Sequence, residues 1–478
     1  MDLAVGTLYK TQVTAHVTDG ADVVVAGAGT AGCVAAIAAA RTGSDVLLVE
    51  RSGYLGGMMT SGNAGLTKYI VHEKSQTDYR EVVKQLATDP ASVQVVGGIP
   101  MEITQRLIDS GAGIATNGQP GSYVFTSQAD FKYLLLEMME EAGVRLLLHS
   151  LIVDVAMNGL SISGIVVENK AGRQVILGRT FVDATGDGDV GALAGAPCVV
   201  GVAPGDLAAD SGTPLGAMHP MGIMFRMGNI DMQSCFEHLF EHPEQFVPQP
   251  FALMALAEAY ESFRRGDMMT INITGIGHRF QIYNTPAPGV FTLCCPSFEG
   301  DGLSAEDLTR GEIALMHEVR KRIGEMKREL PGFENASLLD CPELCVRETR
   351  HFRGEYVLTI EDILSMREFD DTIGKGCHPI DTRPVPEALK QYPLPHRWSF
   401  NIPYRALVPK SVDNLLVAGR CISCTHEASG CIRPTVQCMI TGEAAGVAAA
   451  ICAEHGTPAR ELDTGNLRAT LAAQGVVL

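Results

Sequence analysis

The segment from residue 22 to 50 constrains the fold more than any other part of the chain. An apolar run at 23–26 leads into a G-x-G-x-x-G turn, a helix of small residues, and a second apolar run that ends at Glu50. The turn residues are Gly27, Ala28, Gly29, Thr30, Ala31 and Gly32. This order predicts a β-α-β unit that binds a dinucleotide, with the pyrophosphate at the helix N-terminus and Glu50 on a ribose.

A second glycine motif covers residues 186–191 and follows a predicted strand at 180–183. Its Asp187 and Asp189 place negative charge where a pyrophosphate needs positive potential. We therefore expect a single dinucleotide site and no separate nicotinamide-binding domain.

The composition limits the partners of the chain. Its 478 residues carry 37 basic and 55 acidic side chains, a net charge of −18, which argues against nucleic acid or an anionic membrane as a partner. No apolar stretch reaches the roughly 20 residues that a membrane span needs, and the N-terminus has no signal-peptide pattern. The 13 scattered cysteines predict reduced thiols in a cytoplasmic protein, with a homo-oligomer left open.

The pattern along the chain predicts an α/β fold. We expect a Rossmann-like domain, a parallel sheet with helices, assembled from residues 1–70, 125–204 and 400–478. Residues 71–124 would form a helical insertion, with a helix over 77–115, and 205–399 an irregular α+β cap over the site. The clearest elements are helices over Ser127–Ala142, Ser304–Leu330, Ile440–Glu454 and Thr464–Ala473.

Several longer motifs point to a family. They are TFVDATGDGDVGALAGA at 180–196, RETRHFRGEYVLTIEDIL at 347–364, and NLLVAGRCISCTHEASGCIRPTVQ at 414–437. In this combination the sequence resembles the FAD-dependent oxidoreductases related to fumarate reductase and succinate dehydrogenase flavoproteins.

That resemblance implies FAD and a set of residues around it. In addition to the first turn, it assigns to the cofactor Glu50, Arg51, Gly56, Gly57, Met58, Ile152, Thr185, Gly186, Asp187, Gly419, Arg420, Pro434, Thr435 and Val436. The helix that opens at 433–436 would direct its positive end to the flavin, where negative charge develops on reduction. Loop 56–61 lacks the histidine that links flavin covalently in some relatives, so we expect non-covalent FAD.

The catalytic candidates lie in the basic cluster 347–353 and before the last long helix. Arg350 and Arg433 would hold an anion, while His351 and His426 would transfer protons. Alternatively, the arginines of the cluster pair with local acids and hold the cap to the FAD-binding domain.

The cysteines do not predict a metal. Cys421, Cys424, Cys431 and Cys438 lack a compact cluster spacing, and buried free thiols are the simpler interpretation, with a redox disulfide between the first two as an alternative.

The sequence thus predicts hydride transfer between flavin and a small polar, possibly carboxylated substrate, with an unidentified electron acceptor or donor. An oxygen-using oxidase or monooxygenase, a net non-redox hydration or isomerisation, and a non-catalytic FAD-stabilised partner protein remain alternatives.

Overall fold

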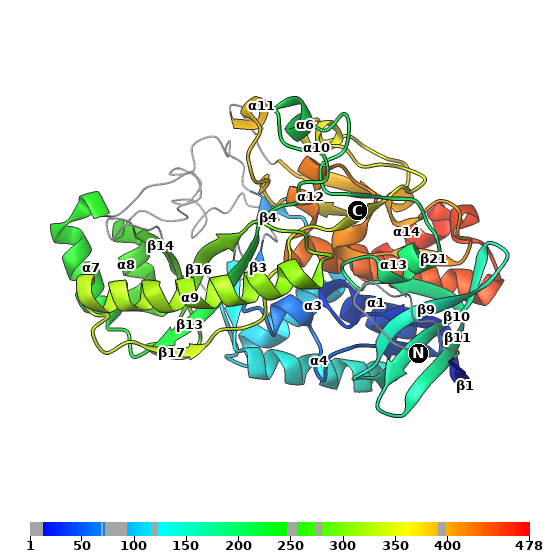
Figure 1. Cartoon of the computed structure of the whole chain (residues 1–478), viewed down its shortest axis with the longest axis horizontal. Helices are drawn as coiled ribbons and strands as arrows, with labels where there is room; N and C mark the ends of the chain where they lie inside the picture. The colour runs from blue at the N-terminus through cyan, green and yellow to red at the C-terminus, as the bar shows by residue number, and fades with distance from the viewer. Residues whose placement is uncertain are drawn as a thin grey trace, which may run out of the picture.

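The computed structural model describes residues 13–67, 70–71, 93–115, 123–245, 256–273, 280–390 and 398–478. Figure 1 shows an elongated molecule in which the N- and C-terminal segments build one half and the green and yellow-green middle of the chain extends from it. The early part of the helix predicted over 77–115 lies outside the described residues. Its later part is α3 (Gly98–Asp109).

A seven-stranded sheet forms the centre of the larger half. Its parallel part contains β8 (Arg145–Leu147), β2 (Val46–Val49), β1 (His16–Ala26), β11 (Gly172–Asp183) and β21 (Leu415–Val417). Two antiparallel strands, β10 (Ser161–Asn169) and β9 (Leu151–Asn158), continue from β11. The apolar ends of β1 and β2 are fully buried, as strands covered on both faces must be. The predicted α/β fold class is confirmed.

Small residues bring two helices unusually close beside this sheet. A Cβ on Gly442 of α13 (Thr435–His455) would lie 2.2 Å from the carbonyl oxygen of Ala31 in α1 (Thr30–Arg41), and one on Gly446 would lie 2.1 Å from that of Ala35. Helix α13 is long and apolar enough to cross a membrane, yet the whole of its apolar window is buried inside the protein. Its composition therefore reflects a core position.

The middle of the chain folds around its own antiparallel sheet. The strand order is β14 (Thr270–Ile273), β15 (Phe280–Asn284), β16 (Phe291–Phe298), β13 (Met221–Gly228) and β17 (Ser337–Asp340). The 25-residue helix α9 (Ala305–Glu329) lies along this sheet and buries Leu315, Val319 and Met326 against it. The helix predicted over Ser304–Leu330 is thus confirmed, and Ser304 is its N-cap. The sheet was missed because the sequence pattern in this region is irregular.

Packing follows these two sheets. Residues 221–346 supply one hydrophobic cluster, and the other large cluster combines residues 23–196 with residues 352–471. Phe352, Ile373 and Trp398 belong to the latter cluster, although they precede the predicted boundary at 399. The predicted domain boundaries remain predictions, and the packing favours a cap core that ends near 346.

The remaining described elements are short or peripheral. The helices are α4 (Gln128–Ala142), α5 (Asp189–Leu193), α6 (Leu207–Asp210), α7 (Met232–Glu241), α8 (Leu256–Arg265), α10 (Ile360–Leu364), α11 (Glu387–Lys390), α12 (His426–Ile432) and α14 (Thr464–Ala473). The strands are β3 (Leu66–Thr67), β4 (Ile70–Val71), β5 (Val93–Gln94), β6 (Gly113–Ile114), β7 (Tyr123–Thr126), β12 (Cys198–Val200), β18 (Arg350–Phe352), β19 (Thr372–Gly376) and β20 (Phe400–Pro403).

Candidate active site

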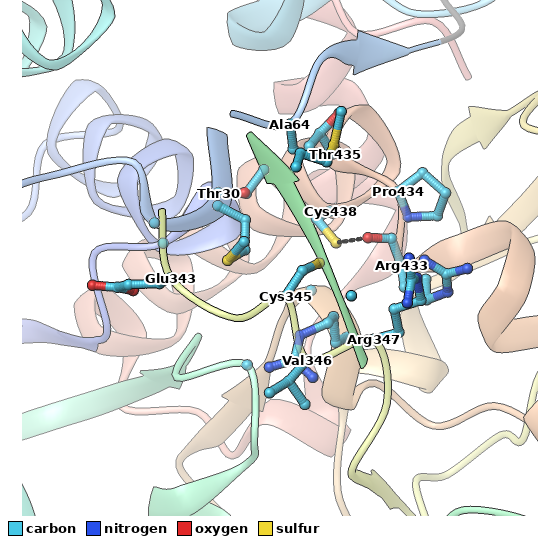
Figure 2. Close-up of a pocket in the computed structure, with 18 of the residues that line it drawn as sticks. Thr30, Ala64, Glu343, Cys345, Val346, Arg347, Arg433, Pro434, Thr435 and Cys438 are labelled. Carbon is cyan, nitrogen blue, oxygen red and sulfur yellow. Dashed lines mark hydrogen bonds between the residues drawn. The ribbon is translucent and has the colours of Figure 1, made fainter. Parts of the chain in front are cut away.

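A cavity of about 750 Å³ lies between the carboxyl ends of β1, β2 and β11 and the antiparallel sheet. Most of the predicted cofactor residues line it: Gly27, Gly29, Thr30, Ala31, Glu50, Arg51, Gly57, Met58, Thr185, Gly186, Asp187, Gly419, Arg420, Pro434 and Thr435. Figure 2 shows Cys345 in the middle of the view. Thr30 lies on one side of it, and both Arg347 and Arg433 lie on the other. The topology therefore brings segments from four distant parts of the chain to one hollow.

The first glycine turn is shaped by contacts that tolerate no side chain. Gly27 has φ +89°, and a Cβ on Gly32 would lie 1.8 Å from the carbonyl oxygen of Gly27. Glu50 supports the turn from the next strand, because its carboxylate accepts the N–H of Ala28 at 2.6 Å and that of Ser52 at 2.7 Å. Gly29 is left open towards the cavity, as close approach of a pyrophosphate requires.

Donor groups of the second glycine motif are hydrogen-bonded within the protein. Asp183 accepts hydrogen bonds from the N–H groups of Thr185 and Gly191 and from the Thr185 hydroxyl, at 2.7–3.1 Å. Burial raises the pKa of Asp183 to about 6 against the effect of these donors. The motif thus stabilises a turn through carboxylates.

Arg420 offers a donor to a bound anion. Its Nη2 donates to Asp187 Oδ1 at 2.8 Å, while its buried Nη1 has no hydrogen-bond partner among the residues that the structure describes. A buried donor without a partner is costly, and a phosphate oxygen would satisfy it. The open Gly29 and the partnerless nitrogen of Arg420 both fit the pyrophosphate of a dinucleotide.

Five predicted cofactor residues are not among those that line the cavity. They are Ala28, Gly32, Gly56, Ile152 and Val436. Ile152 belongs to β9, where it pairs with Val167 of β10. Their assigned contacts with FAD remain predictions.

Among the catalytic candidates, only Arg433 lines the cavity in the described part of the chain. Arg350 donates to the carbonyl oxygen of Asp187 at 2.8 Å and to Asp189 at 3.1 Å. That pairing agrees with the alternative interpretation, in which the arginines of the basic cluster pair with acids and hold the cap to the FAD-binding domain. The acid, Asp189, is distant in sequence and not a local one.

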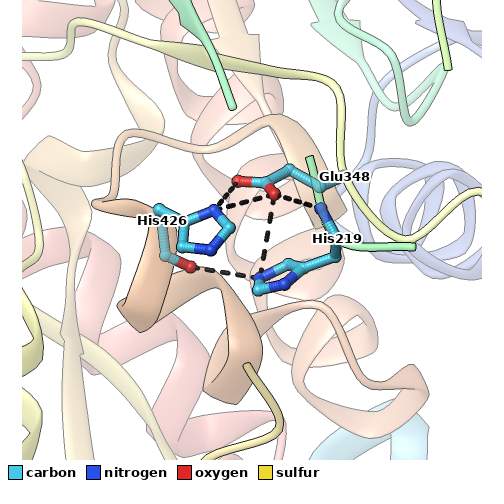
Figure 3. Close-up of side chains that lie close together, drawn as sticks. All are labelled: His219, Glu348 and His426. Atoms are coloured by element: carbon cyan, nitrogen blue, oxygen red, sulfur yellow. Dashed lines mark hydrogen bonds and ion pairs between the residues drawn. The ribbon is translucent and has the colours of Figure 1, made fainter. Parts of the chain in front are cut away.

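His351 and His426 instead belong to a buried group that we call the histidine hub: His219, Glu348, His351 and His426. Figure 3 shows how His219, Glu348 and His426 lie around one another. Glu348 lies between the rings, 2.9 Å from His351 Nε2 and 2.9 Å from His426 Nδ1, and it accepts the N–H of His219 at 2.8 Å. The rings of His219 and His426 stack with centroids 4.1 Å apart. His351 also reaches Cys424, with Nδ1 3.5 Å from Sγ.

The hub has a defined pattern of charge. Burial opposes ionisation of Glu348, but the bonds from His351 and His426 hold its pKa well below the usual range. Burial acts against His351 too, yet Cys424 and Glu348 raise its pKa well above the usual value. Burial lowers the pKa of His219 to about 3, so this ring is neutral. The arrangement corresponds to one buried ion pair between Glu348 and His351.

Part of the hub also has the spacing of a metal site. His219, Glu348 and His426 present ligand atoms within 4.8 Å of one another. In the structure these atoms are engaged in hydrogen bonds: His426 Nδ1 with Glu348, and His219 Nε2 with Ser429 Oγ at 3.2 Å.

A second charged group faces the cavity and consists of Arg347, Arg383, Arg433 and Asp381; we call it the arginine cluster. Arg433 Nη2 donates to Asp381 Oδ2 at 2.5 Å, and Arg383 Nε donates to Oδ1 at 3.2 Å. Arg347 donates to the carbonyl oxygen of Pro220, and none of the described carboxylates forms an ion pair with it. Burial lowers the pKa of Arg347, and Arg433 and Arg383 add to this effect.

The cavity wall contains residues that the sequence did not single out. Tyr283 and Cys294 come from the antiparallel sheet, and His378 follows β19. They lie in or near strands whose pattern was too weak to place them. Cys421 and Cys424, considered as a redox pair, are free thiols, and burial raises the pKa of Cys421 well above its usual value.

The fold and cavity define a dinucleotide-binding α/β protein, and comparison with known proteins gives the family. Residues 22–471 match the model of a family described as FAD dependent oxidoreductase. The chain therefore belongs to the FAD-dependent oxidoreductases, and FAD is its cofactor.

Curated proteins contain no match to the chain. Solved structures that resemble it include a geranylgeranyl bacteriochlorophyll reductase-like protein from Thermoplasma acidophilum (11% identity, TM-score 0.44, 95% of this chain and 83% of that chain). Others are a myxobacterial chondrochloren halogenase (13%, 0.44, 95% and 78%) and p-nitrophenol 4-monooxygenase from Pseudomonas putida (11%, 0.44, 96% and 89%).

Proposed function

We propose that the protein transfers hydride between FAD and a small carboxylated organic substrate held by the arginine cluster. The observation that carries this proposal is the charge of the cluster. Arg347, Arg383 and Arg433 bring three positive charges to one part of the cavity and Asp381 brings one negative charge, which leaves a net charge of +2.

Arg347 is the residue best suited to a substrate carboxylate. Its guanidinium is planar and can donate two parallel hydrogen bonds to a carboxylate. A bound anion would also relieve the electrostatic cost of a buried cation close to Arg383 and Arg433. Arg433 has a buried Nε without a hydrogen-bond partner, so a second oxygen of the substrate can be accommodated.

Apolar side chains complete this end of the cavity. Phe125 and Tyr283 stack with ring centroids 4.4 Å apart, and Met224, Ile380 and Val385 line the same space. They exclude water and strengthen the attraction between the arginines and an anion. The size of the cavity and its mixed lining suit a small molecule bound beside a cofactor.

The other end of the cavity would hold FAD. Gly27 and Gly29 would receive the pyrophosphate, Glu50 the ribose and Arg420 a phosphate oxygen. The N-terminus of the 21-residue helix α13 provides unpaired N–H groups and a partial positive charge at the wall. FAD supplies the two-electron chemistry when it is bound.

An anaerobic titration tests the proposal. The FAD-loaded protein is mixed with a panel of organic acids, and flavin absorbance is recorded. We expect bleaching by one or more carboxylates and none by their methyl esters or amides, which lack the charge. Bleaching by the neutral analogues alone would contradict the role of the arginine cluster.

The same experiment separates the alternatives. Rapid return of absorbance on admitting air would favour an oxygen-using enzyme, and turnover without bleaching would favour a non-redox reaction. The finer relation to fumarate reductase and succinate dehydrogenase flavoproteins, the roles assigned to Arg350, His351 and His426, the electron partner, the cytoplasmic location and a homo-oligomer remain predictions.

A further inference from the structure

We infer that residues 343–347 form a strap over the FAD cavity, and that a hydrogen bond between Tyr54 and Glu343 latches this strap at the cofactor end. The latch limits how fast FAD leaves the protein. This inference concerns retention of the cofactor, so it goes beyond the proposed reaction and holds for any substrate.

Every residue of the strap lines the cavity: Glu343, Leu344, Cys345, Val346 and Arg347. In a β-strand successive side chains point to opposite faces, so alternate residues line one wall, as Gln281 and Tyr283 of β15 do. The strap belongs to none of the described strands. It connects β17 of the cap sheet to β18, whose Phe352 packs in the core of the larger half. The strap therefore runs along the cavity where the chain passes between the two halves.

Two contacts attach the strap to the cap. The backbone N–H of Cys345 donates to the carbonyl oxygen of Gly222 in β13 at 2.7 Å, and the N–H of Gly222 donates back at 3.1 Å. The N–H of Leu344 donates to Glu312 of α9 at 3.0 Å. Because both partners belong to the cap, these bonds do not close the strap onto the other half.

The closing contact is made by the side chain of Glu343. Its carboxylate accepts a hydrogen bond from the hydroxyl of Tyr54, which lies 289 positions earlier in the chain and also lines the cavity. Tyr54 belongs to the glycine-rich loop that follows β2 in the larger half. Lys132 of α4 lies over the Tyr54 ring, with Nζ 4.4 Å from its centroid, and this contact favours the orientation in which the hydroxyl meets Glu343.

The latch lies at the cofactor end of the cavity. Tyr54 follows Glu50, the expected ribose ligand, by four positions. Figure 2 shows Glu343 on the same side of Cys345 as Thr30 of the first glycine turn, whereas Arg347 lies on the other side. The bond between Tyr54 and Glu343 thus spans the part of the cavity that would hold the adenosine of FAD.

The latch can open without detachment of the cap. Glu343 is exposed and Tyr54 is half-buried, so water can replace their bond, and contacts of this kind open locally at little cost. Asn63 of the same loop is buried and donates to Asp340 at the end of β17 at 2.8 Å. That bond still joins the loop to the cap when the latch is open.

The test measures FAD release from protein loaded with ¹⁴C-labelled FAD after an excess of unlabelled FAD is added. Tyr54→Phe keeps the ring under Lys132 and removes only the hydroxyl. We expect it to release FAD about tenfold faster than wild type, the effect of losing one hydrogen bond to a charged group. Tyr133→Phe is the matched control, because Tyr133 is 67% exposed on α4 and is not among the residues that line the cavity.

Variants of Glu343 distinguish a latch from a general loosening of the protein. Glu343→Gln keeps an oxygen that accepts the Tyr54 hydroxyl and should release FAD at close to the wild-type rate. Glu343→Ala should release it as fast as Tyr54→Phe. The double variant Tyr54→Phe/Glu343→Ala should be no faster than either single variant, because both substitutions remove the same bond. Glu343 is exposed, so its variants provide the test even where Tyr54→Phe does not fold.

Either of two results would overturn the inference. One is release at the wild-type rate from Glu343→Ala or from folded Tyr54→Phe. The other is an effect that Tyr133→Phe reproduces or that adds up in the double variant. No carboxylate enters these measurements, so a failure of the latch leaves the proposed function intact, and a failure of the carboxylate panel leaves the latch intact.

Discussion

The histidine hub and the arginine cluster are both charged and are adjacent in the chain, since Arg347 directly precedes Glu348. The hub is buried, whereas the arginine cluster lies at the cavity wall, where the Arg383 side chain is 49% exposed. In the hub one carboxylate is hydrogen-bonded to the side chains of His351 and His426 and to the backbone N–H of His219, and the exposed fractions of these side chains are 0–4%. In the arginine cluster one carboxylate is shared by Arg383 and Arg433, and Arg347 has no acidic partner among the described residues.

The difference distinguishes a structural charge from a charge that can bind a ligand. A buried ion pair whose atoms are hydrogen-bonded to protein groups has little left to offer a substrate. A partly buried cation that faces a cavity retains its desolvation penalty in the free protein. Binding of an anion offsets that penalty, so anion binding is favoured. The hub contacts the cavity wall at Arg383, whose backbone N–H donates to His219 Nδ1 at 3.1 Å.

The largest effect should follow removal of the hub carboxylate. Glu348→Ala leaves His351 as an uncompensated buried charge, which typically costs roughly 3–5 kcal/mol of unfolding free energy. Urea denaturation followed by circular dichroism measures it. Glu368→Ala, at an exposed position, is the control and should change stability little. A loss for Glu348→Ala no greater than that of the control would show that the hub is not a stabilising ion pair.

Arg347→Met should weaken ligand binding without lowering stability, the reverse of what we expect for Glu348→Ala. Truncating one partner of a buried charge pair weakens binding by about 2–5 kcal/mol, so we expect the carboxylate to bind at least ~30-fold more weakly. Stability should be unchanged or slightly higher, because a buried cation is replaced by an apolar chain of similar length. Flavin spectral titration and urea denaturation provide the two measurements. Arg328→Met on the exposed face of α9 should alter neither.

The pH dependence of the unfolding free energy should show whether His219 of the hub is neutral in the folded protein. Its folded pKa of about 3 lies below the unfolded value near 6.5, so the unfolded chain takes up this proton first as the pH falls. Stability therefore decreases from pH 6.5 towards pH 3, by up to about 1.4 kcal/mol per pH unit from this group.

The measurement compares wild type with His219→Asn by urea denaturation from pH 6.5 to 4.5, above the unfolded pKa of Glu348. His351, whose folded pKa is raised, has the opposite effect near pH 6.5, because its unfolded ring is only half protonated there. This effect is common to both proteins and cancels in the comparison. Equal slopes in the two proteins would mean that His219 is not held neutral.

The smallest effect should come from chelation. Because His219 Nε2, His426 Nδ1 and the Glu348 carboxylate already take part in hydrogen bonds, EDTA or 1,10-phenanthroline should leave the unfolding transition unchanged. A fall in stability on chelation, restored by added Zn²⁺, would identify the hub as a metal site.

The sequence predicted the cofactor half of the site well because its constraints are local. Gly27 and Gly32 must be glycines for reasons of backbone geometry within one β-α-β unit, and Glu50 follows from the end of the next strand. The catalytic half depends on which side chains from distant segments face one space. Two catalytic candidates were chosen from the basic cluster 347–353 because it has the highest density of positive charge. Spacing along the chain cannot show which way each of its side chains points.

Residues 347–351 illustrate this limit. They lie within five positions, yet Arg347 faces the cavity, Glu348 and His351 face the hub, and Arg350 pairs with Asp189. His378 was not chosen because nothing beside it in the sequence marks it as special. Its place in the cavity wall, beside Asp381 and Arg383, follows from the folding of β19 against α13.

By itself, then, the sequence determined a dinucleotide-binding α/β fold and the family that uses FAD. Glycine turns and buried strands can be recognised from residues that are close together in the chain. The tertiary structure alone decided which charges are neutralised inside the protein and which remain open to a ligand. That distinction depends on distances between segments far apart in the chain, and electrostatic energies change steeply over those few ångströms.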